Sequence, residues 1–209
     1  MPCNVVCVSH STGSGGDEVG KRVAERLGYL YVDEDIVARA AAQGGIEPQD
    51  VADEERRKSF AHRFVETMAE GGGDAWMLGA PVAAALAESV RPSDIRALIR
   101  ETVEQTAARG NVVIVAHAAS HALEAGPGTL RVFVTASPDT RAARVGAAEE
   151  LDEAAAARAI KDSDAGRRDY LKRFYAIDRE SPTDYDLVLN TDLLSTADAA
   201  EIVVRAAGS

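Results

Sequence analysis

The chain has 209 residues, enough for one substantial hydrophobic core, and we expect a single domain with an insertion. Hydrophobic residues make up 46% and charged residues 27%, as in an ordinary soluble globule. The formal net charge of −11 argues against a broad nucleic-acid or anionic-membrane surface, and no apolar run approaches membrane-spanning length.

The chain opens with a predicted strand, a glycine-rich loop and a helix. Residues 4–9 form an apolar run with three valines, which is typical of a strand buried on both faces. The loop Gly13, Ser14, Gly15 and Gly16 follows, and apolar residues then recur at helical spacing. Backbone N–H groups in such a loop, with a helix start behind them, form a concave phosphate site. A plain strand-to-helix turn that uses glycine for its torsions is the other interpretation.

Further strands and helices alternate along the rest of the chain. We expect strands at Tyr29–Val32, Asn111–Ala116, Leu130–Thr135 and Asp186–Asn190. We expect helices at 36–43, 47–70, 81–90, 93–109, 138–148, 152–175 and 197–207. Short β-branched strands separated by helical patterns predict an α/β fold with a parallel sheet covered by helices on both faces.

Two arginines follow the predicted strand at residues 130–135. Arg141 and Arg144 lie three residues apart, just beyond the carboxyl end of that strand. Ligands of open α/β sheets gather at this edge, so both arginines are candidate ligand-binding residues.

A second basic cluster lies on the penultimate helix. Arg167, Arg168, Lys172 and Arg173 are crowded there, and Asp164 lies one turn before Arg168, with which it can pair. One interpretation is a solvated helix face with ion pairs. The other is a lid whose arginines close over a phosphoryl group, since guanidinium matches phosphate with two hydrogen bonds.

Several segments together resemble the cytidylate kinase-like family of P-loop kinases. The segment SHSTGSGGDEVGKRVAERLGYLYVDEDI resembles the family's opening of Ser-Arg-x-x-Gly-Ser-Gly-Gly, a helix and Tyr-x-x-Asp. NVVIVAHAASHAL resembles its strand that ends in Gly-Arg-Gly-Ala, and RVFVTASPDTRAARV resembles its strand-Ala-Pro-x-x-x-Arg-x-x-Arg. KDSDAGRRDYLKRFYAID and YDLVLNT resemble its lid helix and last strand, and these two matches are the most specific. The resemblance covers nearly the whole chain.

The resemblance implies a three-layer P-loop kinase fold with a parallel five-stranded sheet. The core would comprise residues 1–35 and 110–209, with a helical acceptor-binding insert at 36–109 and a lid at about 155–180. The implied activity is an ATP-dependent nucleoside monophosphate kinase with Mg²⁺, and CMP or dCMP is the default acceptor. Phosphoryl transfer would be in line, catalysed by positioning and charge neutralisation.

The resemblance also implies roles for individual residues. The donor site would comprise Gly13, Ser14, Gly15 and Gly16 around the phosphates, with Arg141 and Arg144 beside the base and phosphates. Asp33 would lie at the mouth of the acceptor site. The catalytic residues of the lid and acceptor pocket would be Asp164, Arg167 and Arg168.

One residue departs from an ordinary Walker loop only, and three depart from the pattern of the family. Gly16 stands at the lysine position of an ordinary Walker loop, as it does in the family, and Asp17 stands at the hydroxyl position. An anionic Asp17 would repel phosphate unless a metal lay between them, which makes it the candidate metal ligand. His10 and His117 replace two family arginines. Both histidines can be read as polar residues that are satisfied at a strand end. For His117 the alternative is a ligand of the acceptor phosphate.

These departures leave two functions open. The intact lid motif favours a kinase, whereas the replaced arginines favour a catalytically weak or inactive nucleotide-binding regulatory protein. In both cases the expected partners are nucleotides, not nucleic-acid polymers or membranes. Because no signal-peptide pattern is present and both cysteines suit a reduced core, we expect a cytoplasmic protein; the sequence leaves a homo-oligomer open.

Overall fold

The computed structural model describes residues 3–33, 100–101, 103–116, 118–123 and 125–208. Its strands are β1 (Val5–His10), β2 (Leu30–Val32), β3 (Val112–Val115), β4 (Thr129–Thr135) and β5 (Leu187–Asn190). Its helices are α1 (Gly16–Leu27), α7 (Ala119–Ala122), α8 (Pro138–Glu149), α9 (Glu153–Tyr175) and α10 (Thr196–Ala207), and Pro182–Asp184 forms a 3₁₀ turn.

The five strands form one parallel sheet in the order β2-β3-β1-β4-β5. All six residues of β1 are buried, because this strand has a neighbour on each side and helices on both faces. Val6 lies beside Val113 on β3 and Leu130 on β4. The predicted α/β class and parallel sheet are therefore confirmed.

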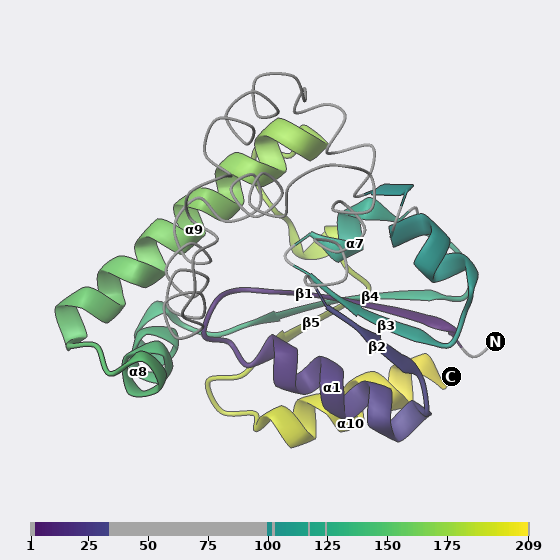
Figure 1. The fold of residues 1–209 in the computed structure, drawn as a ribbon, viewed down its shortest axis with the longest axis horizontal. Helices are drawn as coiled ribbons and strands as arrows, with labels where there is room; N and C mark the ends of the chain where they lie inside the picture. The colour runs from purple at the N-terminus through teal and green to yellow at the C-terminus, as the bar shows by residue number, and fades with distance from the viewer. Residues whose placement is uncertain (1–2, 34–99, 102, 117, 124, 209) are drawn as a thin grey trace, which may run out of the picture.

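Alternate residues of the strands supply two separate cores. On one face, Val6 and Val8 pack with Val19 of α1 and Val203 of α10. Figure 1 shows α1 and α10 side by side on this face, with α7 and α9 on the opposite side of the sheet. On that opposite face the core includes Cys7. Cys7 is a free cysteine, as is Cys3, and burial raises the pKa of the Cys7 thiol to about 12.

The helix ends follow from local capping residues. Asp152 accepts a hydrogen bond from the backbone N–H of Ala155 and so begins α9, and Ser137 caps α8 in the same way through Thr140. Gly28 ends α1 in the left-handed region, at φ 67°. The helices predicted at residues 138–148, 152–175 and 197–207 are each observed within one residue of the expected ends.

Most of the predicted insert lies outside the described residues. This applies to the helices expected at 36–43, 47–70 and 81–90 and to residues 93–99 and 102 of the helix expected at 93–109; residues 100–101 and 103–108 are helical. The division into core, insert and lid therefore stays a prediction. Within the described ranges, no helix has the length and apolar character needed to span a membrane.

Candidate phosphate-binding site

The glycine-rich loop, residues 11–15, joins the carboxyl end of β1 to α1. Gly13 and Gly15 have φ values of 78° and 80°, in the left-handed region that favours glycine. A Cβ on Gly13 would lie 2.7 Å from the carbonyl oxygen of Arg141. A Cβ on Gly15 would lie 2.7 Å from Cγ2 of Thr196. Both glycines are thus required by torsion and by space.

The backbone carbonyls of residues 10 to 14 are all held by donors on the protein side of the loop. These donors are Arg167 to His10 (3.3 Å), Ser14 N–H to Ser11 (3.0 Å), Arg141 to Thr12 (3.3 Å), Arg144 to Gly13 (3.3 Å) and Thr191 Oγ1 to Ser14 (2.8 Å). Three arginines from two different helices therefore hold carbonyl oxygens of this loop and of His10, the residue directly before it.

The N–H groups of the same loop have a different environment. Those of Thr12, Gly13, Gly15 and Gly16 donate to no acceptor in the part of the chain that the structure describes. The helix α1 starts at this point, and its N-cap Gly15 has no side chain to satisfy the first N–H groups. Free donors at a helix start carry partial positive charge and suit an anion such as phosphate.

Arg141 connects the loop to α8 and α9. Its side chain is buried, with the residue 4% exposed, and its two terminal nitrogens donate to the Asp164 carboxylate at 2.9 and 2.7 Å. Its Nε donates to the carbonyl of Ala136 at 3.1 Å. The expected pairing of Asp164 with Arg168 is wrong, because Asp164 faces α8 and Arg168 lies on the exposed side of α9.

Arg144 and Thr191 connect the loop to the end of β5. Arg144 donates to Thr191 Oγ1 at 3.0 Å and to the Thr191 carbonyl at 2.7 Å. Thr191 is fully buried, and its hydroxyl donates a hydrogen bond to the Ser14 carbonyl. Thr191 was not predicted as a site residue; the only signal for it was its position at the end of YDLVLNT, directly after the last strand.

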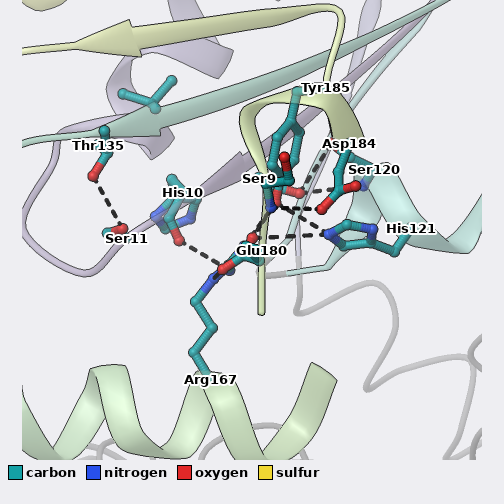
Figure 2. Close-up of polar contacts among 12 residues, drawn as sticks. Ser9, His10, Ser11, Ser120, His121, Thr135, Arg167, Glu180, Asp184 and Tyr185 are labelled. Atoms are coloured by element: carbon teal, nitrogen blue, oxygen red, sulfur yellow. Dashed lines mark hydrogen bonds and ion pairs between the residues drawn. The ribbon is translucent and has the colours of Figure 1, made fainter. Parts of the chain in front are cut away.

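Arg167 lies at the centre of a second buried network, shown in Figure 2. It is 7% exposed, and its Nε and Nη2 donate to the two carboxylate oxygens of Glu180 at 2.8 and 2.7 Å. Tyr185 donates its hydroxyl proton to Glu180. Because that proton is used, the 3.1 Å contact between the Tyr185 oxygen and His121 Nε2 requires a proton on Nε2.

The network shifts the titration of its members. Burial alone would raise the pKa of Glu180, but hydrogen bonds from Arg167 and His121 outweigh it and hold that pKa far below its ordinary value. Burial raises the pKa of the Tyr185 hydroxyl well above its usual range. Glu180 is therefore a carboxylate and Tyr185 a neutral phenol at neutral pH. Sequence reasoning identified neither residue, nor His121, because their meeting depends on the fold.

His10 and Gly16 are packed against each other at the start of α1. A Cβ on Gly16 would lie 2.2 Å from Cβ of His10, which is itself buried. The position of the Walker lysine therefore has no room for a side chain. His10 Nε2 lies 3.4 Å from Oδ1 of Asp17, whose side chain is 61% exposed in the first turn of α1.

The remaining predicted residues differ in what the structure shows. The exposed Arg168 makes no hydrogen bond or ion pair within the described ranges. Lys172 pairs with Asp178 at 2.9 Å and Arg173 with Asp169 at 2.8 Å, so these two cations fit a solvated face with ion pairs. Asp33, partly exposed, directly follows β2 at the carboxyl edge of the sheet, whereas His117 lies outside the described residues.

The sheet order and the glycine-rich loop after β1 define a P-loop-type kinase fold. The model of the cytidylate kinase-like family matches residues 5–193, so the chain belongs to that family. Among curated proteins, no match was found.

Solved structures share this fold at low identity. An uncharacterized protein from Eubacterium ventriosum is 16% identical, covers 97% of both chains and has a TM-score of 0.66. Shikimate kinase from Bacteroides thetaiotaomicron is 13% identical, with 97% of both chains covered and a TM-score of 0.53. A gluconokinase from Sinorhizobium meliloti is 16% identical, covers 99% of this chain and 89% of its own, and has a TM-score of 0.52. These likenesses show the fold alone.

Proposed function

We propose that the protein is an ATP-dependent nucleoside monophosphate kinase that transfers the γ-phosphoryl group of ATP to CMP or dCMP. The observation that carries the proposal is the segment from His10 to Gly16. The carbonyls of residues 10 to 14 accept hydrogen bonds from the protein, while the N–H groups of Thr12, Gly13, Gly15 and Gly16 donate to no acceptor among the described residues. Such a loop needs no reorganisation to receive phosphate oxygens, and preorganised donors are the main source of catalysis in phosphoryl transfer. Membership of the cytidylate kinase-like family supports a nucleotide as the substrate.

The residues around the loop fit Mg²⁺ that is held mainly by phosphate oxygens and water. Asp17 offers an exposed carboxylate at the loop, and no group of three or more metal-ligating side chains occurs in the part of the chain described. Mg²⁺ in kinases is commonly bound by one or two carboxylates plus substrate phosphates, so a single aspartate is sufficient. Mg²⁺ bound there would neutralise phosphate charge, while Asp17 would orient it.

The charge-neutralising role of the missing lysine falls to a residue outside the loop. Gly16 leaves no room for a lysine, and Arg141, Arg144 and Arg167 already donate to protein acceptors. Arg168 is exposed and has no such partner in the described chain, so we assign it the contact with the transferring phosphoryl group. Because Arg141, Arg144 and Arg167 are already bound to protein acceptors, they also favour the second candidate, a catalytically weak nucleotide-binding regulatory protein.

A ligand-binding experiment with a turnover arm tests both candidates. ATP–Mg²⁺ should raise the melting temperature, because a ligand present at 100 times its Kd stabilises by about 2.7 kcal/mol. Gly15→Ala should lose this shift. Gly28→Ala is the matched control, since Gly28 has the same left-handed torsion but no neighbour within 4 Å of its added Cβ.

Turnover then separates the two candidates. CMP-dependent formation of ADP supports the kinase, and an ATP shift without ADP formation supports the regulatory protein. A wild-type protein that shows no thermal shift with any nucleoside mono-, di- or triphosphate at millimolar concentration would refute both.

A further inference from the structure

The partly buried carboxylate of Glu180 lies close to the glycine-rich loop, although Glu180 is far from that loop in the sequence. It lies on the connection between α9 and β5, and its backbone neighbours are fixed. Ser181 and Asp184 exchange reciprocal hydrogen bonds in a capping box. Tyr185 stacks on Phe133 of β4 with a centroid separation of 4.9 Å. A short connecting segment is thus held rigidly against the sheet, with Glu180 directed at α9.

Glu180 reaches the glycine-rich loop through one guanidinium. Two parallel hydrogen bonds fix the plane of the Arg167 side chain on the carboxylate, and this bidentate geometry leaves the guanidinium one orientation. In that orientation Nη1 donates to the carbonyl of His10, the last residue before the loop. The Phe133 ring lies 5.1 Å from the guanidinium carbon and closes the other side.

We infer that Glu180 is a positioning residue for the donor phosphates, acting through Arg167 on the His10 carbonyl and so on the glycine-rich loop. This inference rests on the proposed function, because it presumes that the loop binds the phosphates of ATP. Removal of the Glu180 carboxylate takes away the two hydrogen bonds that orient the buried Arg167 guanidinium. We then expect the guanidinium to move away from the His10 carbonyl. The loop loses one of its outer supports, and its N–H groups lose their fixed direction.

The test compares donor and acceptor binding in variants of the full chain. The probes are ATP–Mg²⁺ and CMP, and their dissociation constants are measured by calorimetry at a temperature where all variants are folded. Glu180→Gln keeps the shape but removes the charge, and we expect ATP–Mg²⁺ binding to weaken at least tenfold while CMP binding changes less than twofold. A merely structural role would reduce the folded fraction and leave both dissociation constants of the folded protein unchanged.

The chain contains a matched control. Asp186 accepts two hydrogen bonds from the Arg131 guanidinium, at 3.2 and 2.9 Å, and a third from its backbone N–H at 2.9 Å. The pair lies between β4 and β5, at the strand ends away from the loop. Asp186→Asn removes the same kind of pair and should leave ATP–Mg²⁺ affinity unchanged. If Glu180→Gln does not fold, Glu180→Asp takes its place; its shorter side chain keeps the charge but reaches only one of the two guanidinium nitrogens, and an intermediate loss of ATP affinity is expected.

A double-mutant cycle decides whether Glu180 acts through Arg167. If it does, Arg167→Ala and the double variant Arg167→Ala/Glu180→Gln should have the same ATP–Mg²⁺ affinity. Without the Arg167 guanidinium, the change at Glu180 can no longer affect the loop. Additive losses would overturn the inference, and so would a Glu180→Gln variant with wild-type ATP affinity. If the wild-type protein binds no ATP at all, the proposed function fails instead, which separates the two failures.

Discussion

Because Gly16 packs against His10, we expect an alanine at position 16 to destabilise the protein. The same substitution at Gly166 should stabilise it. In Gly16→Ala the new Cβ would lie 2.2 Å from Cβ and 2.5 Å from Cγ of His10. Ordinary van der Waals contact begins near 3.4 Å, so one of the two groups must move by about 1 Å. His10 is buried at the end of the central strand and has little freedom to do so.

The expected magnitudes follow from this geometry. Overpacking a buried site costs about 1–3 kcal/mol, so we expect Gly16→Ala to lower the free energy of unfolding by about 2 kcal/mol. Gly166 lies inside α9, and a Cβ there meets nothing within 4 Å. Gly166→Ala should therefore stabilise by about 0.5–1 kcal/mol through helix propensity. For a domain of this size, each kcal/mol shifts Tm by about 2–4 °C.

Urea unfolding of the three proteins, followed by circular dichroism, measures both effects. Gly16→Lys should not restore an ordinary Walker loop, because a lysine side chain begins with the same Cβ. This variant should bind ATP no better than the wild-type protein. A Gly16→Ala protein as stable as wild type, or a Gly16→Lys protein with stronger ATP binding, would refute the claim that His10 excludes a side chain here.

Three further predictions concern residues around the loop. Thr191→Val removes the hydroxyl that serves Ser14 and Arg144, and should cost about 1–3 kcal/mol in urea unfolding while weakening ATP binding in calorimetry. Arg168→Ala should leave Tm within about 1 °C, as is usual for an exposed residue, yet lower phosphoryl transfer at least tenfold in an ADP-release assay; normal transfer would remove Arg168 from the mechanism. Because the pKa of Glu180 is lowered in the folded state, its stabilising contribution is present above the ordinary value of 4.5 and is lost as pH falls below it. The difference in unfolding free energy between wild type and Glu180→Gln should shrink from pH 7 to pH 3, and a constant difference would contradict the pairing with Arg167.

The sheet could be predicted from the sequence because its signals are local. Runs such as NVVIVA are apolar, β-branched and short, and a fully buried parallel strand needs no alternation of polar residues. The capping residues Asp152 and Gly28 fixed helix ends in the same local way. Nothing in the residues alone ordered the strands, since the position of β1 between β3 and β4 depends on which crossovers pack together.

The site could be predicted only in part, because charged side chains choose partners across the fold. The i, i+4 spacing on one helix predicts that Asp164 pairs with Arg168. In the structure Asp164 pairs instead with Arg141, which lies on α8. Arg167 and Arg168 are adjacent in sequence, yet one is buried against Glu180 and the other exposed. Which arginine faces a ligand is decided by the rotation of α9 against the sheet, and that rotation is a tertiary property.

The hydrogen bonds that Arg141, Arg144 and Arg167 make to protein acceptors change what their positive charge can do. A guanidinium that donates to a loop carbonyl still contributes a positive potential behind the phosphate site, but a neighbouring carboxylate reduces it for Arg141 and Arg167. Arg144 donates to neutral acceptors only, Thr191 and the Gly13 carbonyl, among the described residues, so its full charge remains beside the loop. If the loop binds phosphate as we propose, the static field at the phosphates would depend on Arg144 more than on Arg141 or Arg167. In the proposed reaction we assign the mobile charge at the transferring group to Arg168, and on that assignment its removal should affect turnover without affecting the fold.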